Sequence, residues 1–384
     1  MFRKMPLILI ILIVMIVLLD RYISMEVKSI IYAISLSIKE LIVFVLPLVI
    51  FGLLFKVAAT LAGHATRFII LLLLAVYCSN YLTTFVSQFV GLFVYQFDML
   101  LIKPQDMHGL LPYWQFSLPK LIANDKAMLL GLALGVITGW LNTTLAEKIS
   151  HSFEIVISKV FGVLTILIPF FVAGFIVKLQ ADGIITILVK DYALIFAVIA
   201  IAQFSYIMLI YYVANKFNVS QMVQSIKNML PATIVGFSTM SSAAAMPLTV
   251  VGTEKNLTNP KLASSVIPAT VNIHLIGDCF AIPIFAYAIL KNYGMVEPTF
   301  LVYLTFAFYF VLAKFSVAAV PGGGILVMLP ILESHLGFNS EMLSLITALY
   351  VLFDPVITSA NVMGNGGFAM LLNRLKRLFC QMSG

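Results

Sequence analysis

Long apolar stretches, separated by short polar segments, recur along the whole chain. A helix needs roughly 20 mainly apolar residues to cross the hydrocarbon layer of a bilayer. On that scale the pattern predicts about eight full crossings, at roughly residues 5–20, 38–60, 67–96, 126–145, 154–178, 184–213, 262–290 and 341–372. The prediction is therefore an all-α polytopic membrane protein.

Two further apolar segments, near residues 226–250 and 301–333, are interrupted by polar residues, glycine and proline. The first interruption runs from Ser238 to Pro247 and the second covers residues 318–324. Non-helical backbone at membrane depth must be buried in protein or line a wet cavity, because lipid cannot satisfy its N–H and C=O groups. A matching pair of such segments points to the substrate site of a secondary transporter. We therefore expect two re-entrant helical hairpins beside the full crossings.

Composition agrees with this interpretation. Hydrophobic residues make up 62% of the chain and charged residues only 10%, too few to cover the surface of a soluble domain. The net charge of +7 is explained by basic residues at the cytoplasmic ends of spans, so no nucleic-acid partner is expected. Cys78, Cys279 and Cys380 show neither metal-ligand spacing nor a disulfide framework, and we expect no cofactor.

Basic residues also mark the two ends of the chain. Arg3 and Lys4 precede the first apolar run, and Arg374, Lys376 and Arg377 follow the last one. The positive-inside rule then predicts two cytoplasmic termini, which an even number of crossings requires. The first run resembles a signal peptide, but no small-residue cleavage pattern follows it, so we expect an uncleaved span.

The last span carries the richest set of polar residues. Asp354, Thr358, Asn361 and Asn365 are four, three and four residues apart, which places them on one face of a helix. A charged side chain at the centre of a span costs about 2.5–3.5 kcal/mol on insertion scales, so it usually serves a function. A carboxylate, a hydroxyl and two amides suit an ammonium group and a metal cation. The alternative is polar contact between helices.

The preceding span contains Asn272, His274 and Asp278. His274 and Asp278 are four residues apart, so on a continuous helix they share a face and are able to hydrogen-bond or exchange a proton. The alternative is a histidine that serves only packing. Thr83 and Thr84, in the middle of an earlier span, are candidate oxygen ligands for a small cation, although threonine is also common between helices.

Four segments together carry a resemblance to a known family. They read Ser241-Ser242-Ala243-Ala244-Ala245-Met246-Pro247, Ala269-Thr270-Val271-Asn272-Ile273-His274-Leu275, Ala319-Val320-Pro321-Gly322-Gly323-Gly324 and Asp354-Pro355-Val356-Ile357-Thr358-Ser359-Ala360-Asn361-Val362-Met363-Gly364-Asn365. In order and spacing they resemble the first hairpin, the seventh helix, the second hairpin and the eighth helix of the dicarboxylate/amino acid:cation symporter family, which includes the glutamate transporter homologues. The resemblance runs from about Leu41 to Leu372 and identifies a divergent member.

The resemblance implies the elevator fold of this family: a homotrimer in the cell membrane, here expected to be a bacterial inner membrane. In each protomer a transport domain slides against a trimerisation scaffold. Residues 1–60 and 126–215 are expected to form mainly the scaffold. Residues 61–97 and 216–384 are expected to form mainly the transport domain, with both hairpins and the last two full helices.

The resemblance also implies roles for single residues. Asp354 is expected to pair with the amino group of a substrate, with Thr358 and Asn361 in contact with it. The carboxylate of the substrate is expected to lie at the tips of the two hairpins, at Ser241, Ser242, Val320 and Gly324. Asn272 and Asn361 match ligands of one family sodium site, and Thr83 and Thr84 match side chains of another. Asn365 is a further candidate cation ligand.

Departures from the family pattern alter the expected substrate and ion. The family's arginine for a second carboxylate is replaced by Ile357, and its alternative position on the first hairpin is Met240. Since a guanidinium is the usual reader of such a group, we expect cation-coupled symport of a neutral amino acid. An acidic amino acid or a C4-dicarboxylate is the alternative.

Two family aspartates are replaced by His274 and Asn365. This change predicts either weakened sodium coupling or proton coupling through His274 and Asp278. A divergent copy with altered activity is a further alternative.

Two other classes of protein are weaker hypotheses. An intramembrane hydrolase would use Ser241 or Ser242 as nucleophile and His274 as base, but the serine-rich tip lacks a glycine elbow. A passive channel would show flux without saturation or accumulation. We expect a transporter and not an enzyme.

Overall fold

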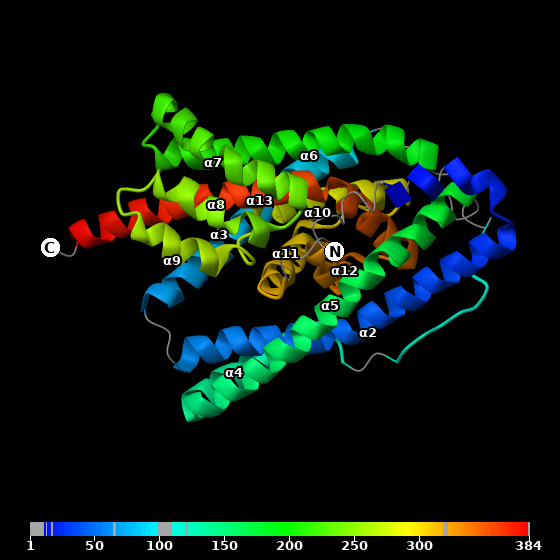
Figure 1. Ribbon diagram of the computed structural model, residues 1–384, viewed down its shortest axis with the longest axis horizontal. Helices are drawn as coiled ribbons and strands as arrows, with labels where there is room; N and C mark the ends of the chain where they lie inside the picture. The colour runs from blue at the N-terminus through cyan, green and yellow to red at the C-terminus, as the bar shows by residue number, and fades with distance from the viewer. Residues whose placement is uncertain are drawn as a thin grey trace.

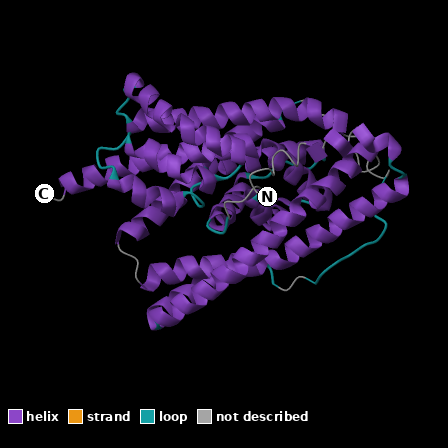
Figure 2. Cartoon of the chain, in the orientation of Figure 1, coloured by secondary structure: helices purple, strands orange, loops and turns teal. Residues whose placement is uncertain are grey.

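The computed structural model describes residues 11–12, 14–16, 18–63, 67–97, 110–119, 122–183, 185–317 and 322–382. Every regular element in these ranges is a helix (Figure 2), which confirms the all-α prediction for this part of the chain. The predicted first crossing, near residues 5–20, lies largely outside the described residues.

The helices follow the apolar stretches closely. In chain order they are the 3₁₀ helix η2 (Asp20–Tyr22), α2 (Met25–Gly63), α3 (Arg67–Tyr95), α4 (Asn124–Leu141), α5 (Thr143–Ala181), α6 (Ile185–Ala214), α7 (Val219–Thr239), α8 (Ser242–Glu254), α9 (Lys261–Thr270), α10 (Ile276–Asn292), α11 (Phe300–Lys314), α12 (Gly323–Leu336) and α13 (Ser340–Met382). Several begin at a polar cap. Asn142, for example, accepts the N–H of Leu145 at 2.9 Å at the start of α5.

Four segments in the described part of the chain are long and apolar enough to cross a membrane: Met25–Ala59, Ile69–Tyr95, Tyr192–Ala214 and Ser340–Arg374. Shorter apolar helices include Phe300–Lys314 and Gly323–Leu336. Large apolar side chains also cover much of the outer surface, as on α4 and α6, where Leu141 is 81% and Ile201 68% exposed. Such a surface needs an apolar solvent, as expected for a multi-pass membrane protein.

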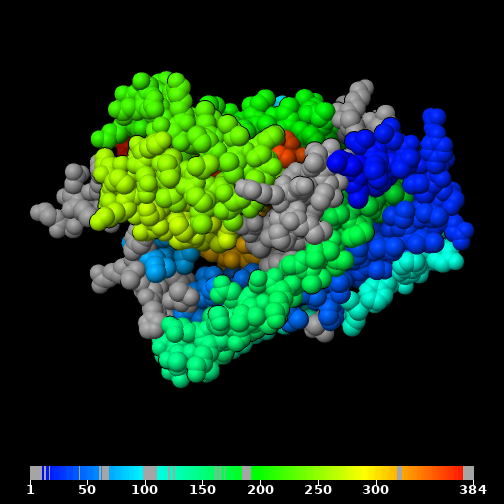
Figure 3. Space-filling view, in the orientation of Figure 1, coloured from blue at the N-terminus to red at the C-terminus, as the bar shows by residue number. Residues whose placement is uncertain are grey.

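The helices form two groups of contacts. α2, α4 and α5 pack against one another along one edge of the molecule (Figure 1), where they form a diagonal band in the space-filling view (Figure 3). In the other group α13 contacts α6, α7, α8 and α10, while α10 also packs on α3. The residues discussed below lie in this second group and on α9, α11 and α12, of which α9 and α12 contact α13 and α11 contacts α3.

A ridge of glycines brings α4 against α2. A Cβ atom on Gly131, Gly135 or Gly139 would lie 2.5–2.7 Å from a carbonyl oxygen of α2. The four-residue spacing keeps the three on one face, and small residues let membrane helices approach closely. These close approaches of backbone to backbone hold the apolar helix α4 against α2.

We expect Gly135→Leu to separate α4 from α2 and destabilise the protein. The carbonyl oxygen of Phe55 and the Cβ of Ala58 would both clash with the new side chain, and backbone cannot move aside cheaply. Overpacking of this kind costs about 1–3 kcal/mol. Thermal unfolding in detergent measures the loss. Gly162→Leu on α5 is the control, because no atom lies within 4 Å of a Cβ at that position.

The two interrupted segments form helix pairs. α7 ends where Met240 adopts a left-handed conformation, with φ at 50°, and α8 begins directly after Ser241. α11 and α12 pack against each other and are separated by residues 315–322. Their arrangement fits the predicted hairpins, although the re-entrant course of each in a membrane stays a prediction.

The predicted continuous span over residues 262–290 is wrong, because the chain breaks between α9 and α10. Asn80 on α3 stabilises the break: its Nδ2 donates to the carbonyl of Ile273 at 2.7 Å, and its Oδ1 accepts the N–H of Leu275 at 3.2 Å. A side chain from a distant helix thus satisfies backbone groups that a helix would pair internally.

Candidate functional site

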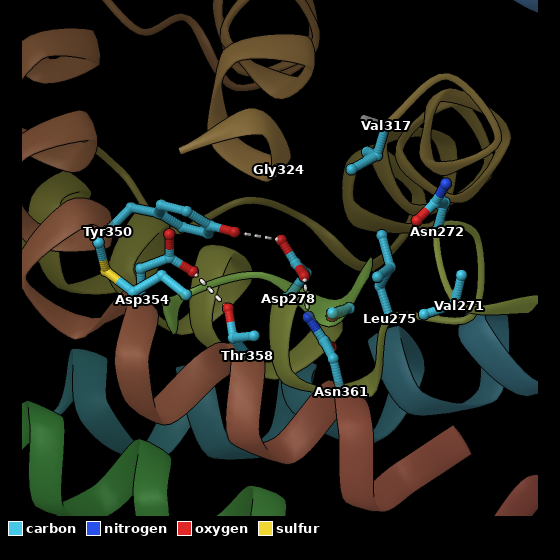
Figure 4. A pocket seen from close by; sticks show the side chains of 12 residues that line it. Val271, Asn272, Leu275, Asp278, Val317, Gly324, Tyr350, Asp354, Thr358 and Asn361 are labelled. Atoms are coloured by element: carbon cyan, nitrogen blue, oxygen red, sulfur yellow. Dashed lines mark hydrogen bonds between the residues drawn. The ribbon is translucent and has the colours of Figure 1, made fainter. Parts of the chain in front are cut away.

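A pocket lies where the two interrupted helix pairs, the α9–α10 break and α13 meet (Figure 4). It is lined by Met240, Ser242, Val271, Asn272, Leu275, Asp278, Val317, Gly324, Tyr350, Asp354, Thr358 and Asn361. Its cavity volume is about 30 Å³, room for little more than one water molecule. Entry of a larger molecule therefore requires at least one of the surrounding elements to move.

Asp354 joins α13 to the tip of the second helix pair. Its side chain is 3% exposed. Oδ2 accepts the N–H of Gly322 at 3.0 Å, and Oδ1 accepts the hydroxyl of Thr358 at 2.8 Å. Both carboxylate oxygens have hydrogen-bond donors, and neither of these donors, Gly322 and Thr358, is a cation. A buried carboxylate of this kind favours a ligand that brings its own positive charge.

Asp278 is the second buried carboxylate of the pocket, and its three contacts come from two elements, α11 and α13. Its Oδ1 accepts the hydroxyl of Tyr350 at 2.8 Å and lies 3.3 Å from Nζ of Lys314. Its Oδ2 accepts Nδ2 of Asn361 at 2.7 Å. Lys314 is the last residue of α11 and is fully buried. An ion pair therefore lies directly beside the pocket.

Two glycines allow the helices to approach the carboxylates. A Cβ on Gly324, in the first turn of α12, would collide with Oδ1 of Asp278 and the hydroxyl oxygen of Tyr350. A Cβ on Gly277 would collide with the carbonyl oxygen of Ile357 on α13. The N–H of Gly277 donates to Oδ1 of Asn361 at 2.8 Å. Only residues without a side chain fit at these two crossings.

The chain matches the sequence profile of the Sodium:dicarboxylate symporter family over residues 126–375, which is more than half of its length. The protein belongs to this family.

Individual relatives are more distant. The excitatory amino acid transporter of Onchocerca volvulus is 30% identical over 140 residues, covering 36% of this chain and 28% of the relative. Excitatory amino acid transporter 2 of Homo sapiens is 29% identical over 170 residues, covering 44% of this chain and 29% of the relative. The matches thus span less than a third of either relative. Family and relatives are transporters, which excludes the hydrolase hypothesis.

In this family member the structure brings Asp354, Thr358 and Asn361 together on one face of α13, and Ser242 and Gly324 line the same pocket. Ser241 instead caps α8, its hydroxyl oxygen accepting the N–H of Ala244 at 3.3 Å, and it is not among the lining residues. Val320 lies outside the described residues.

The predicted contact between His274 and Asp278 is wrong. His274 lies in the α9–α10 break and not on a helix with Asp278. Its Nε2 lies 2.9 Å from Oγ of Ser79, its Nδ1 has no hydrogen-bond partner among the described residues, and its ring stacks on Phe368 at 4.1 Å. Residues four apart share a face only on a continuous helix, and the chain is not helical at His274, so the basis of the prediction is absent.

The candidate cation ligands do not form one cluster. Asn272 is exposed and lies across the pocket from Asp354 and Thr358 (Figure 4). Asn365 is buried on the next turn of α13, and its Nδ2 donates to the carbonyls of His274 at 3.1 Å and Asn361 at 3.0 Å. These two carbonyl oxygens therefore already have a donor.

Thr83 and Thr84 are fully buried on α3. The hydroxyl of Thr83 donates to the carbonyl of Ser79 at 2.7 Å, as expected for a threonine within a helix. Neither threonine is among the residues that line the pocket. The structure thus separates them from the pocket.

Sequence reasoning missed Tyr350 and Lys314 as parts of this site. Tyr350 precedes Asp354 by four residues, so the same helical spacing that grouped Asp354 with Thr358 would have included it. Lys314 is a charged residue within an apolar segment, but the sequence does not identify its partner. Among the described residues that line the pocket there is no arginine or lysine, in agreement with Met240 at the hairpin position.

Proposed function

We propose that the protein is a secondary active transporter that carries a neutral amino acid together with a cation. The observation that carries this proposal is the buried carboxylate of Asp354, whose two hydrogen-bond donors, Gly322 and Thr358, are uncharged. A substrate ammonium would supply its counter-charge. The N-termini of α8 and α12, at Ser242 and Gly324, line the same pocket and suit the substrate carboxylate.

A neutral side chain is favoured over an acidic one. A second substrate carboxylate needs a cationic partner, and the lining residues offer none. The ammonium of Lys314 lies beside the pocket, but it already pairs with Asp278. An acidic amino acid or a C4-dicarboxylate, which the family description and the names of the relatives suggest, is the alternative substrate.

The proposed mechanism is an elevator movement of the α13-centred group against the α2–α4–α5 group within a homotrimer. The extensive packing of α2 with α4 and α5, and of α13 with α7 and α10, supports the division, and α5 and α2 contact α13 and α12 across it. α6 packs on α13 and α10, so we assign it to the moving group and place the boundary at the α5–α6 turn instead of at residue 215. The proposal includes about eight crossings, two re-entrant hairpins and cytoplasmic termini in a bacterial inner membrane.

Sodium or a proton is the proposed coupling ion, and the family description favours sodium. Thr83, Thr84, Asn272, Asn361 and Asn365 remain the candidate cation ligands. Their oxygen atoms are of the type that hard cations prefer. Because these residues are dispersed in the structure, a complete sodium site among them would require a local rearrangement.

Uptake into proteoliposomes tests the proposal. A labelled mixture of neutral amino acids, and aspartate in parallel, is offered with an inward sodium gradient, an inward proton gradient or neither. We expect saturable, gradient-driven accumulation of a neutral amino acid. Aspartate accumulation would support the acidic alternative, and flux without saturation in every condition would indicate a channel and contradict the proposal.

We expect Met240→Arg to shift selectivity toward aspartate. Met240 is buried and lines the pocket, so a guanidinium there could pair with a second substrate carboxylate. The new contact should raise aspartate uptake relative to neutral uptake by about tenfold or more, the effect of a charge-assisted pair. Met240→Gln, with similar length and no charge, is the control. Equal selectivity in both variants would contradict the expected contact.

A further inference from the structure

Lys314 is a fully buried ammonium at the end of an apolar helix. Its side chain is 0% exposed, its Nζ lies 3.3 Å from Oδ1 of Asp278, and it lies 4.5 Å from the ring centroid of Phe310. Removing an ammonium from water costs several kcal/mol unless a counter-charge and hydrogen bonds compensate it. The sequence places this charge beside the pocket in spite of that cost, which calls for a functional explanation.

The carboxylate of Asp278 and the hydroxyl of Tyr350 are oxygen ligands of the kind that a hard cation requires. The hydroxyl oxygen of Tyr350 lies 2.8 Å from Oδ1 of Asp278. Asn361 faces the carboxylate with its amide nitrogen, which donates to Oδ2 at 2.7 Å, while its Oδ1 accepts the N–H of Gly277. The positive charge in contact with this carboxylate is Nζ of Lys314.

We propose that Lys314 is a built-in cation that takes, at Asp278, the place of a bound sodium ion. The consequence of this substitution for ion coupling rests on the proposed function, cation-coupled symport. The ammonium is covalently part of α11, so it neutralises Asp278 without an ion from solution. Sodium, where it is coupled, must then bind away from this carboxylate.

The position of Lys314 argues against direct contact with substrate. It is absent from the residues that line the pocket, whereas its partner Asp278 is among them. The carboxylate therefore lies between the ammonium and the pocket. With Lys314 on Asp278 and a substrate ammonium on Asp354, each buried carboxylate would have one positive partner. This arrangement keeps the closed pocket electrically balanced.

The test is sodium-specific thermal stabilisation of the purified protein, which requires no transport activity. Unfolding is followed in detergent with sodium chloride or choline chloride at equal ionic strength. We expect Lys314→Met to gain a stabilisation by sodium that the wild type lacks at this site. At sodium about a hundred times above Kd, mass action raises the unfolding temperature by several degrees. Lys314→Met with Asp278→Asn should lose this gain, and Lys314→Arg should not show it.

Lys178→Met is the matched control, because Lys178 is also buried and its Nζ lies 2.9 Å from Oδ2 of Asp182 on α5. An equal gain in Lys178→Met would show that any released carboxylate binds sodium, and would overturn the proposal. So would a Lys314→Met protein with the sodium response of the wild type.

If Lys314→Met does not fold, wild type and Asp278→Asn decide the question. Equal sodium responses in these two proteins support the proposal, since sodium then does not use Asp278. Loss of a wild-type response in Asp278→Asn overturns it. These outcomes are independent of whether the protein accumulates an amino acid, so failure of the proposed transport function is recognised separately by the uptake experiment.

Discussion

Asp354→Asn is expected to abolish amino acid uptake while the protein remains folded. Asparagine has the same shape and keeps one oxygen as an acceptor, but it removes the charge that a substrate ammonium needs. Leaving one partner of a buried ion pair unmatched costs about 3–5 kcal/mol, a loss of roughly 10²–10³-fold or more in affinity. Initial uptake rates and substrate-induced thermal stabilisation both measure this loss.

Thr358→Val provides the comparison for Asp354→Asn. Its hydroxyl donates to Oδ1 of Asp354 at 2.8 Å, so valine removes one hydrogen bond and leaves the charge. We expect a loss of about tenfold, the usual effect of one hydrogen bond to a charged group. Uptake by Asp354→Asn within a few-fold of the wild type would show that the carboxylate does not bind the transported molecule.

Gly324→Ala is expected to prevent closure of the second hairpin and thereby to stop transport. The added methyl group would collide with Asp278 and Tyr350, which hydrogen-bond to each other. Asp278 is further held by Asn361 and Lys314, so it has little freedom to move away. Overpacking against fixed atoms costs about 1–3 kcal/mol, which would shift the hairpin toward an open position.

Accessibility of the hairpin measures this shift. A cysteine introduced at Val317, which lines the pocket, should react faster with a polar thiol reagent in the Gly324→Ala background, with the three native cysteines replaced. Gly162→Ala is the matched control, because a Cβ at Gly162 meets no atom within 4 Å. Normal uptake by Gly324→Ala, with unchanged reactivity, would contradict the role of this crossing.

Local patterns predicted the parts of the molecule that depend on local properties. Apolar runs located most of the helices, and the spacing of Asp354, Thr358 and Asn361 placed three pocket residues on one face. Helical periodicity is a property of neighbouring residues, so it can be derived from sequence. The same argument would have included Tyr350 had it been applied one turn earlier.

The features that sequence reasoning missed depend on contacts between distant segments. The break before α10 is stabilised by Asn80, which lies on α3 and is separated from Ile273 by 193 positions. Without that contact, Ala269 to Cys279 resembles a continuous span, and His274 is wrongly paired with Asp278. Lys314 at the end of α11 likewise pairs with Asp278 on α10, 36 positions earlier in the chain. No periodicity of a single segment contains this information.

The hydrogen bond from Gly322 to Asp354 has a consequence for the direction of net flux. The N–H of Gly322 at the hairpin tip is uncharged, and it donates to the same Asp354 carboxylate that the proposed substrate ammonium would pair with. The tip can therefore close over Asp354 with its oxygens satisfied by the protein itself. In an elevator cycle, such self-closure permits a return stroke without cargo. The carrier would then be able to accumulate its substrate, where obligatory one-for-one exchange could not.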